Sequence, residues 1–148
     1  MNIVRLSTGE CSLAQMTFVM MGEVFGDYDR RALRESYLTM LLGRADIWVY
    51  AAVVDMQPVG GLIAHEVPMT RSETSELLVY DLAVRPDWQR RGTGRGLIQR
   101  LLEDAAAAGI PEEWVPADND DSHALEFYRR TGGSAQAVTI FTYPTRSH

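Results

Sequence analysis

The chain has 148 residues, a net charge of −6 and 46% hydrophobic residues, which suits a single domain over residues 1–148 with its own core. The acidic balance argues against nucleic acid as the main partner, because that affinity depends on many Lys and Arg, and it favours a cationic substrate. No apolar run approaches membrane-spanning length and no signal-peptide pattern opens the chain, so we expect a cytoplasmic protein without a membrane partner.

The first half of the chain predicts a strand, two helices and a β-hairpin. The expected ranges are a strand at 2–6, a helix at 12–24 capped by Ser12, a helix at 33–42, and hairpin strands at 47–54 and 59–67. Between the helices, Asp27 lies in an acidic and aromatic link that is a candidate contact for a cationic acceptor. A solvated turn whose aspartate caps the next helix explains this link equally well.

Cys11 is the only cysteine and has no metal-site spacing, so we expect no metal.

A strand, a glycine turn and a helix form the central stretch. Residues 77–84 are apolar except at Asp81, which is typical of a strand covered on both faces. Glycines where the next helix begins would admit an anion to unpaired backbone N–H groups. Positive charge concentrates at this turn in four arginines, namely Arg85, Arg90, Arg91 and Arg95. The stretch predicts a phosphate-binding turn, and a glycine turn that merely connects strand to helix is the alternative.

The spacing of the glycines separates this turn from two common phosphate loops. Glycines at 92, 94 and 96 do not fit GxGxxG, and no Gly-Lys-Ser/Thr follows for a P-loop. Gln89-x-x-Gly-x-Gly after Leu82-Ala83-Val84 resembles instead the acyl-CoA pyrophosphate loop of the GNAT N-acetyltransferase superfamily. The resemblance implies an enzyme that uses acetyl-CoA. The residues expected to bind it are Leu82, Ala83, Val84, Gln89, Arg90, Arg91, Gly92, Thr93, Gly94 and Arg95.

The last third of the chain predicts two further strands and a helix. The expected ranges are a strand at 114–117, an acidic loop at 118–121, a helix at 122–130 and a last strand at 138–143. The resulting order is β, α, α, β, β, β, α, β, α, β, without repeats or linkers. It predicts an α/β fold with one twisted mixed sheet and helices on both faces, and it is the element order of the GNAT fold. Pairing of the last strand between subunits would give the homodimer that the resemblance implies.

Within this superfamily the chain is similar to the aminoglycoside 3-N-acetyltransferases of type I. The matching segments are Phe25-Gly26-Asp27, Tyr37-Leu38 with Leu41-Leu42, Val79 to Val84, Ala117-Asp118 and Tyr128. This similarity implies acetylation of the 3-amino group of an aminoglycoside antibiotic, and so resistance. Asp121 stands where GNAT proteins often have Asn, and the loop around it is more acidic than usual. The extra acidity agrees with a polycationic acceptor and leaves the particular antibiotic in doubt.

Acetyl transfer to nitrogen needs a neutral amine, and an alkylamine with a pKa of about 10.4 is deprotonated only about once in a thousand molecules at neutral pH. A base is therefore required. Asp81 is the candidate, because burial in an apolar strand should raise its pKa. It is also a candidate contact for the acceptor. A buried aspartate that holds a neighbouring loop by hydrogen bonds is the alternative.

Other residues have candidate roles around the thioester and the acceptor. The backbone N–H near Leu82 would donate to the thioester oxygen, and the free backbone groups of Leu82 and Val84 would pair with the pantetheine amides. Tyr128 is by resemblance the proton donor to the thiolate, or else a core tyrosine. The carboxylates expected to hold the acceptor's other ammonium groups are Asp118, Asp120 and Asp121. A solvated loop with a helix cap explains these three carboxylates equally well.

Two rival functions stay open. One is the same chemistry on another amine, such as a polyamine, a small metabolite amine or a protein N-terminus. The other is a non-catalytic module that binds acyl-CoA without turnover.

Overall fold

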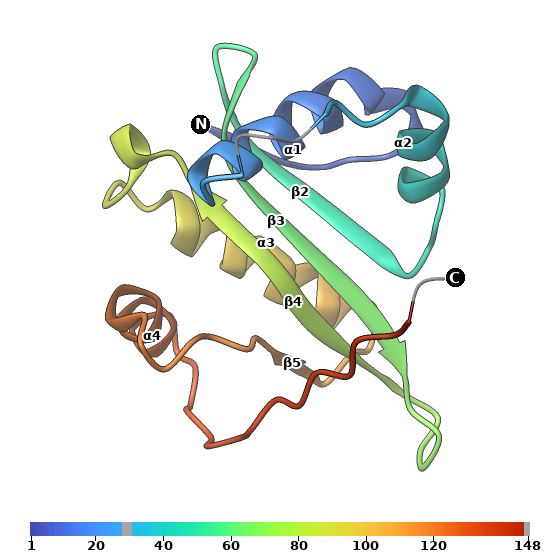
Figure 1. The fold of residues 1–148 in the computed structure, drawn as a ribbon, viewed down its shortest axis with the longest axis vertical. Helices are drawn as coiled ribbons and strands as arrows, with labels where there is room; N and C mark the ends of the chain where they lie inside the picture. Colours follow the sequence, from blue (N-terminus) through green and yellow to red (C-terminus); the bar gives the residue numbers. More distant parts are fainter. Residues whose placement is uncertain (28–30, 147–148) are drawn as a thin grey trace. The chain divides into compact units, whose positions relative to one another are not determined.

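A computed structural model describes residues 1–27 and 31–146 of the chain (Figure 1). The chain forms two compact units, of which the first ends at Pro116 and the second begins at Ala117. A single domain over the whole chain stays a prediction. None of the helices in the described ranges is long and apolar enough to cross a membrane.

The first unit is built on a five-stranded sheet with the order β1-β2-β3-β4-β5. Neighbours from β1 to β4 are antiparallel, and β5 runs parallel to β4. The strands are β1 (Asn2–Arg5), β2 (Ile47–Val54), β3 (Gln57–Pro68), β4 (Ser75–Val84) and β5 (Glu112–Trp114). The helices are α1 (Cys11–Val24), α2 (Glu35–Leu42) and α3 (Thr93–Ala107), with short 3-10 turns η1 (Thr8–Glu10) and η2 (Pro86–Trp88).

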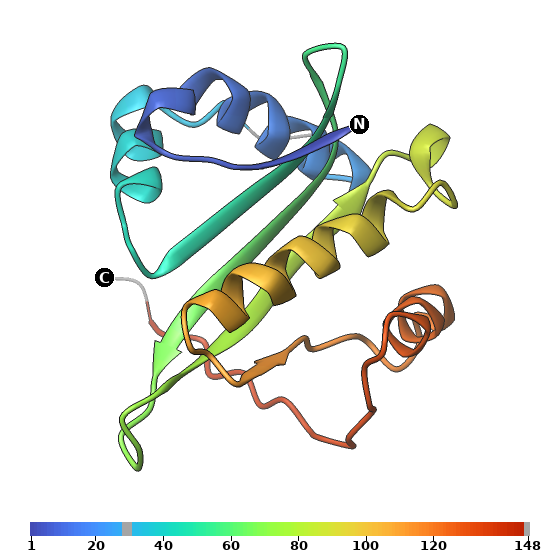
Figure 2. The same cartoon turned by 180° about the vertical axis from the view of Figure 1, so that it is seen from behind.

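The helices cover both faces of this sheet (Figures 1 and 2). On one face, Leu97 and Leu101 of α3 pack with Leu62 and Leu77. On the other face, α1 and α2 contribute a second cluster, in which Leu38 packs with β2. The predicted α/β class, with one mixed sheet and helices on both faces, is confirmed.

The ends of several elements differ from the predicted ones for local reasons. The β2–β3 hairpin turns on only two residues, Asp55 and Met56, which both have positive φ. That is the backbone of a tight hairpin turn, so β3 begins earlier than expected, whereas β2 has its predicted bounds. Ser12 lies inside α1 and does not cap it, because the chain already turns at Ser7 and Glu10, which form a capping box.

Two adjacent glycines of β3 let helices approach the sheet from opposite sides. A Cβ on Gly61 would lie 2.5 Å from the Met21 sulfur on α1. A Cβ on Gly60 would lie 2.9 Å from the Thr93 methyl group at the start of α3. The absence of side chains here therefore fixes the positions of α1 and of the N-terminus of α3.

The second unit contains α4 (Ser122–Arg130), as the sequence predicts. The expected strand at 138–143 is wrong, because these residues belong to no strand in the described part of the chain. Four apolar side chains in this stretch are between 66% and 85% exposed, namely Val138, Ile140, Phe141 and Tyr143. β-branched and aromatic residues of this kind suit a strand, but a strand needs a neighbour to pair with. The homodimer that depended on this strand stays a prediction.

Candidate functional site

A β-bulge in β4 determines which way Asp81 points. Asp81 pairs with Ile63, whereas Ala64 pairs with Val79, so Tyr80 is one residue too many on β4. Val79 packs in the cluster with α3. Ile63 and Ala83 pack against Met20 and Met21 of α1. Side chains alternate along a strand, so Asp81, two residues before Ala83, lies on the α1 face.

The bulge brings two further side chains to this face, and neither was predicted to be part of the site. The rings of His65 and Tyr80 meet edge to face, with centroids 5.8 Å apart. Tyr80 is 65% exposed, whereas the other residues of β4 are buried or partly buried. A bulge gives no fixed sequence signature, so only the single aspartate in the apolar run marked this position.

Within residues 1–27 and 31–146, the edge of β4 beyond Leu78 has no strand partner, since β5 pairs only with Glu76 to Leu78. The Arg85 N–H donates to the Val59 carbonyl, and backbone groups alternate sides along an antiparallel ladder. It follows that the groups of Leu82 and Val84 point away from β3, toward this open edge. Ala83, also expected to bind the cofactor, turns its backbone to Gly61 on β3 and its methyl group to α1.

The turn between β4 and α3 presents backbone N–H groups at a helix start. Arg90 and Gly92 have φ of 61° and 83°, both left-handed. No hydrogen bond within the described chain uses the N–H groups of Arg91, Gly92 or Gly94. Successive N–H groups in a turn at a helix N-terminus form an anion-binding concavity. The geometry suits a phosphate group.

Some arginine side chains of this turn contact other residues of the chain, so they are less available to bind a phosphate than the sequence suggested. Arg85 is held by Asp87 through two hydrogen bonds of 3.1 and 2.6 Å. The Arg91 guanidinium lies 4.8 Å from the centre of the Trp88 ring. The side chain of Arg90 has no partner among the described residues. The positive charge at the turn is therefore partly offset by Asp87.

Two polar side chains of the turn point back to the protein. The Gln89 Nε2 donates to the Val84 carbonyl at 3.0 Å. The Thr93 hydroxyl donates to the Trp88 carbonyl at 3.3 Å, and Thr93 is 1% exposed. Their side chains hold the turn together in this structure, and their expected contact with the cofactor stays a prediction.

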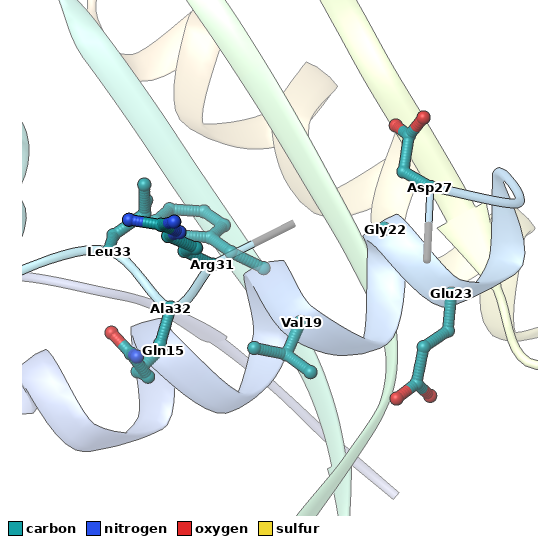
Figure 3. A pocket seen from close by; sticks show the side chains of 9 residues that line it. Gln15, Val19, Gly22, Glu23, Asp27, Arg31, Ala32 and Leu33 are labelled. Atoms are coloured by element: carbon teal, nitrogen blue, oxygen red, sulfur yellow. The ribbon is translucent and has the colours of Figure 1, made fainter. Parts of the chain in front are cut away.

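Asp27 follows the end of α1, where Gly26 takes a left-handed conformation. It lines a pocket of about 170 Å³ between α1 and residues 31–33 (Figure 3). In this view Asp27 and Glu23 point away from each other. The Gln15 Oε1 is buried here without a partner among the described residues. The lining is mainly apolar, with Asp27 and Glu23 as its carboxylates, and it belongs to the first unit alone.

The acidic loop of the second unit is largely occupied with its own backbone. Asp118 accepts from the Asp120 N–H at 2.9 Å, and Asp121 caps α4 by accepting from the Ala124 N–H at 3.0 Å. All three aspartates are exposed. The alternative of a solvated loop with a helix cap thus describes Asp118 and Asp121. Each of these carboxylates still has a second oxygen that could bind a ligand.

Tyr128 lies on α4 and is partly buried, with its ring 5.2 Å from that of Phe127. Burial raises the pKa of the Tyr128 hydroxyl, and the negative charge of Asp121 raises it further. The hydroxyl therefore stays protonated at neutral pH, as a proton donor must.

Residues 12–133 match the family model described as the acetyltransferase (GNAT) family. The chain belongs to this family. It also resembles two aminoglycoside acetyltransferases, each from an uncultured soil metagenomic sample. One is 29% identical, with 99% of this chain and 96% of that chain covered and a TM-score of 0.93, and its structure holds sisomicin. The other is 32% identical, with 98% of each chain covered and the same TM-score of 0.93.

The curated relatives of this GNAT chain include other N-acetyltransferases. The ribosomal protein bS18 alanine N-acetyltransferase of Escherichia coli K12 is 27% identical over 77 residues, which are 52% of each protein. An uncharacterized N-acetyltransferase of Methanocaldococcus jannaschii is 30% identical over 114 residues, covering 75% of this chain and 50% of the relative. The chain spans about half the length of the curated relatives it matches.

Proposed function

We propose that this GNAT chain transfers the acetyl group of acetyl-CoA to the 3-amino group of an aminoglycoside and thereby confers resistance. The observation that carries the proposal is the similarity to two aminoglycoside acetyltransferases over at least 96% of their length. The net charge of −6 agrees with a polycationic acceptor.

The residues around the start of α3 fit the two parts of acetyl-CoA. The unengaged N–H groups of Arg91, Gly92 and Gly94 suit a pyrophosphate. The open edge at Leu82 suits an extended chain with amide groups, which would pair there as a strand does. These two features lie on consecutive segments of the first unit.

We assign one residue of the chain to each step of the proposed transfer that moves or donates a proton. When bound, acetyl-CoA supplies a thioester that is open to attack by an amine. Asp81 takes the proton from the acceptor nitrogen, directly or through water. The Leu82 N–H donates to the thioester oxygen, where negative charge develops as the C–N bond forms. Tyr128 would give its proton to the sulfur as the C–S bond breaks, and its raised pKa means that the hydroxyl is protonated before this step.

The acceptor is held by carboxylates and by one aromatic ring. Asp81 and Tyr80 are adjacent on the bulge, so an ammonium group near Asp81 would also meet the exposed ring of Tyr80. Asp27, Asp118, Asp120 and Asp121 bind further ammonium groups in this proposal. Their charges are exposed, so their contribution falls as salt increases.

Steady-state assays of thiol release test this function. Sisomicin and other aminoglycosides would be compared with spermidine and with a peptide that begins with alanine. We expect the largest kcat/KM with an aminoglycoside, and product NMR should place the acetyl group on the 3-amino nitrogen. Turnover of the peptide alone would refute the antibiotic assignment, and CoA binding without any turnover would indicate a non-catalytic module.

Acetylation of a protein N-terminus is the second candidate function. The similarity to the bS18 alanine N-acetyltransferase over 77 residues favours it. The lower coverage of that relative, at 52%, is why we place it second. The alanine peptide in the same assay decides between the two functions.

A further inference from the structure

Trp114, the last residue of β5, turns its indole to the face of the sheet that carries Asp81. Leu77 of β4 packs with α3 on the other face, and Glu113 is its register partner on β5. Side chains alternate along a strand and register partners share a face, so Trp114 lies on the α1 face. Val115, the next residue, packs in the α3 cluster, as this alternation requires.

Three neighbouring strands bring aromatic rings together on this face (Figure 1). Leu78 of β4 pairs with His65 on β3 and with Trp114 on β5, and adjacent strands lie about 5 Å apart. Tyr80 lies two residues further along β4, and its ring meets that of His65 with centroids 5.8 Å apart. His65, Tyr80 and Trp114 thus form an aromatic row directly before Asp81.

The rings of the aromatic row are open to a ligand. Trp114 is 46% exposed and Tyr80 is 65% exposed, and His65 is partly buried. Among residues 1–27 and 31–146, the Trp114 indole N–H has no hydrogen-bond partner, and no guanidinium or aromatic ring pairs with its face. Tryptophan and tyrosine supply large, rigid contact areas at binding surfaces. The aromatic row is therefore available to a molecule outside the chain.

The charge around the aromatic row is negative. Glu76 of β4 and Glu112 of β5 are register partners on this same face, and like charges directly opposite each other on a sheet repel. Asp81 pairs with Ile63 and Glu76 pairs with Val67, which places Asp81 and Glu76 about 13 Å apart along the sheet. Carboxylates at both ends of the row complement an elongated polycation.

A polycation built of saturated rings fits this face. An ammonium group binds best over the face of tryptophan, and it also binds over tyrosine. The C–H face of a saturated ring packs on an aromatic ring as other apolar surface does. An aminoglycoside has both features, since its amino groups stand around saturated six-membered rings. Because the row begins directly before Asp81, one acceptor molecule can reach both.

We propose that Trp114 determines acceptor specificity: its indole binds an amino-sugar ring of the aminoglycoside that does not react, while the reacting nitrogen lies at Asp81. Tyr80 completes the aromatic surface, and the Glu76 and Glu112 carboxylates attract the ammonium groups of that ring. The inference rests on the proposed function and names the part of the acceptor that this sheet face holds. Binding of a remote ring lowers the KM for large acceptors and leaves kcat unchanged.

Trp114→Leu removes the indole and tests this role. Leu102→Ala is the matched control, since Leu102 on α3 is 47% exposed, close to the exposure of Trp114. Two acceptors are compared, namely sisomicin and 2-deoxystreptamine, which is the central ring of sisomicin with its two amino groups. Only sisomicin offers a further ring to Trp114, so the ratio of the two kcat/KM values measures what the indole contributes.

We expect Trp114→Leu to raise the KM for sisomicin about three- to tenfold with kcat retained. The kcat/KM for 2-deoxystreptamine and the KM for acetyl-CoA should change less than about twofold. Trp114→Phe keeps a ring and should recover most of the loss, and Leu102→Ala should change none of these values. Equal losses with both acceptors would show a general structural role and overturn the proposal, as would an unchanged KM for sisomicin.

Trp114→Thr provides a second variant if Trp114→Leu does not fold, and thermal unfolding monitors both. Calorimetry with 2-deoxystreptamine replaces the kinetics if this small acceptor is not turned over. Turnover of sisomicin by the wild type, with no effect of Trp114→Leu, overturns this inference and leaves the proposed function standing. Absence of turnover with every aminoglycoside overturns the proposed function, and this inference with it.

Discussion

Val79 and Asp81 are two residues apart in β4 and lie on opposite faces of the sheet. In a regular strand they would share a face, but Tyr80 is an extra residue between them. Val79 can therefore pack with α3 while Asp81 lies on the face of α1. The bulge turns a carboxylate that would have been buried beside Leu97 toward a face where an acceptor can approach.

Asp81→Asn should lower kcat/KM for the aminoglycoside by about 10²- to 10⁴-fold, because the amide cannot take a proton. The substitution keeps the shape of the side chain, so CoA affinity should not change. Asp46→Asn is the matched control, since Asp46 pairs with Arg44 on the surface at 2.8 Å. Full activity of Asp81→Asn at neutral pH would show that Asp81 is not the base.

Tyr80→Ala should raise the KM for the aminoglycoside about three- to tenfold, because it removes a ring face worth about 0.5–1 kcal/mol or more to an ammonium group. The KM for acetyl-CoA should stay the same. Tyr143→Ala, at a tyrosine that is 85% exposed, serves as the control. Equal effects on both KM values would place the role of Tyr80 in the fold and not in acceptor binding.

The sequence predicted the helices and most strands because each has a clear apolar period or a glycine at its end. Gly43 after Leu42 and the apolar run before Val84 are such signals. The bulge at Tyr80 and the Gln89 bond to Val84 could not be predicted, because they depend on the pairing of distant segments. The segment 138–143 shows the opposite error, since its residue types suit a strand but no described strand pairs with it.

Part of the candidate site could be predicted, because some of its residue types indicate a chemical role. The glycine turn and Asp81 stand out by their residue types in the sequence, whereas Tyr128 was assigned through the family resemblance. The sequence does not show that Asp87 binds the Arg85 guanidinium. The direction of the Ala83 backbone groups follows from the β3–β4 register, which only the structure reveals.

Gly60→Ala should destabilise the chain by about 1–3 kcal/mol, because a Cβ there overpacks the sheet against α3. It would lie 2.9 Å from the Thr93 methyl group, 3.2 Å from Leu97 and 3.4 Å from the Ala83 carbonyl. Since Thr93 begins α3, CoA affinity should fall as well. Urea unfolding and calorimetry measure both effects. Gly9→Ala, where a Cβ meets nothing within 4 Å, should change neither value.

Tyr50 should make the stability of the fold depend on alkaline pH. It is fully buried, and its hydroxyl donates to Asp104 at 2.8 Å. Burial raises the pKa of Tyr50 well above its usual value, and the hydrogen bond to the Asp104 carboxylate raises it further. The unfolded chain then loses this proton above a pH of about 10 while the folded chain keeps it, so stability is full below that pH and falls as pH rises further.

Urea unfolding from pH 8 to 11 measures this dependence in the wild type and in Tyr50→Phe. The variant should be about 1–3 kcal/mol less stable at pH 8, because Asp104 loses a donor, and its stability should fall less steeply above pH 10. Tyr143→Phe alters an 85% exposed side chain that buries little on folding, so it should keep the wild-type slope. A slope in Tyr50→Phe as steep as that of the wild type would mean that another group causes the alkaline loss.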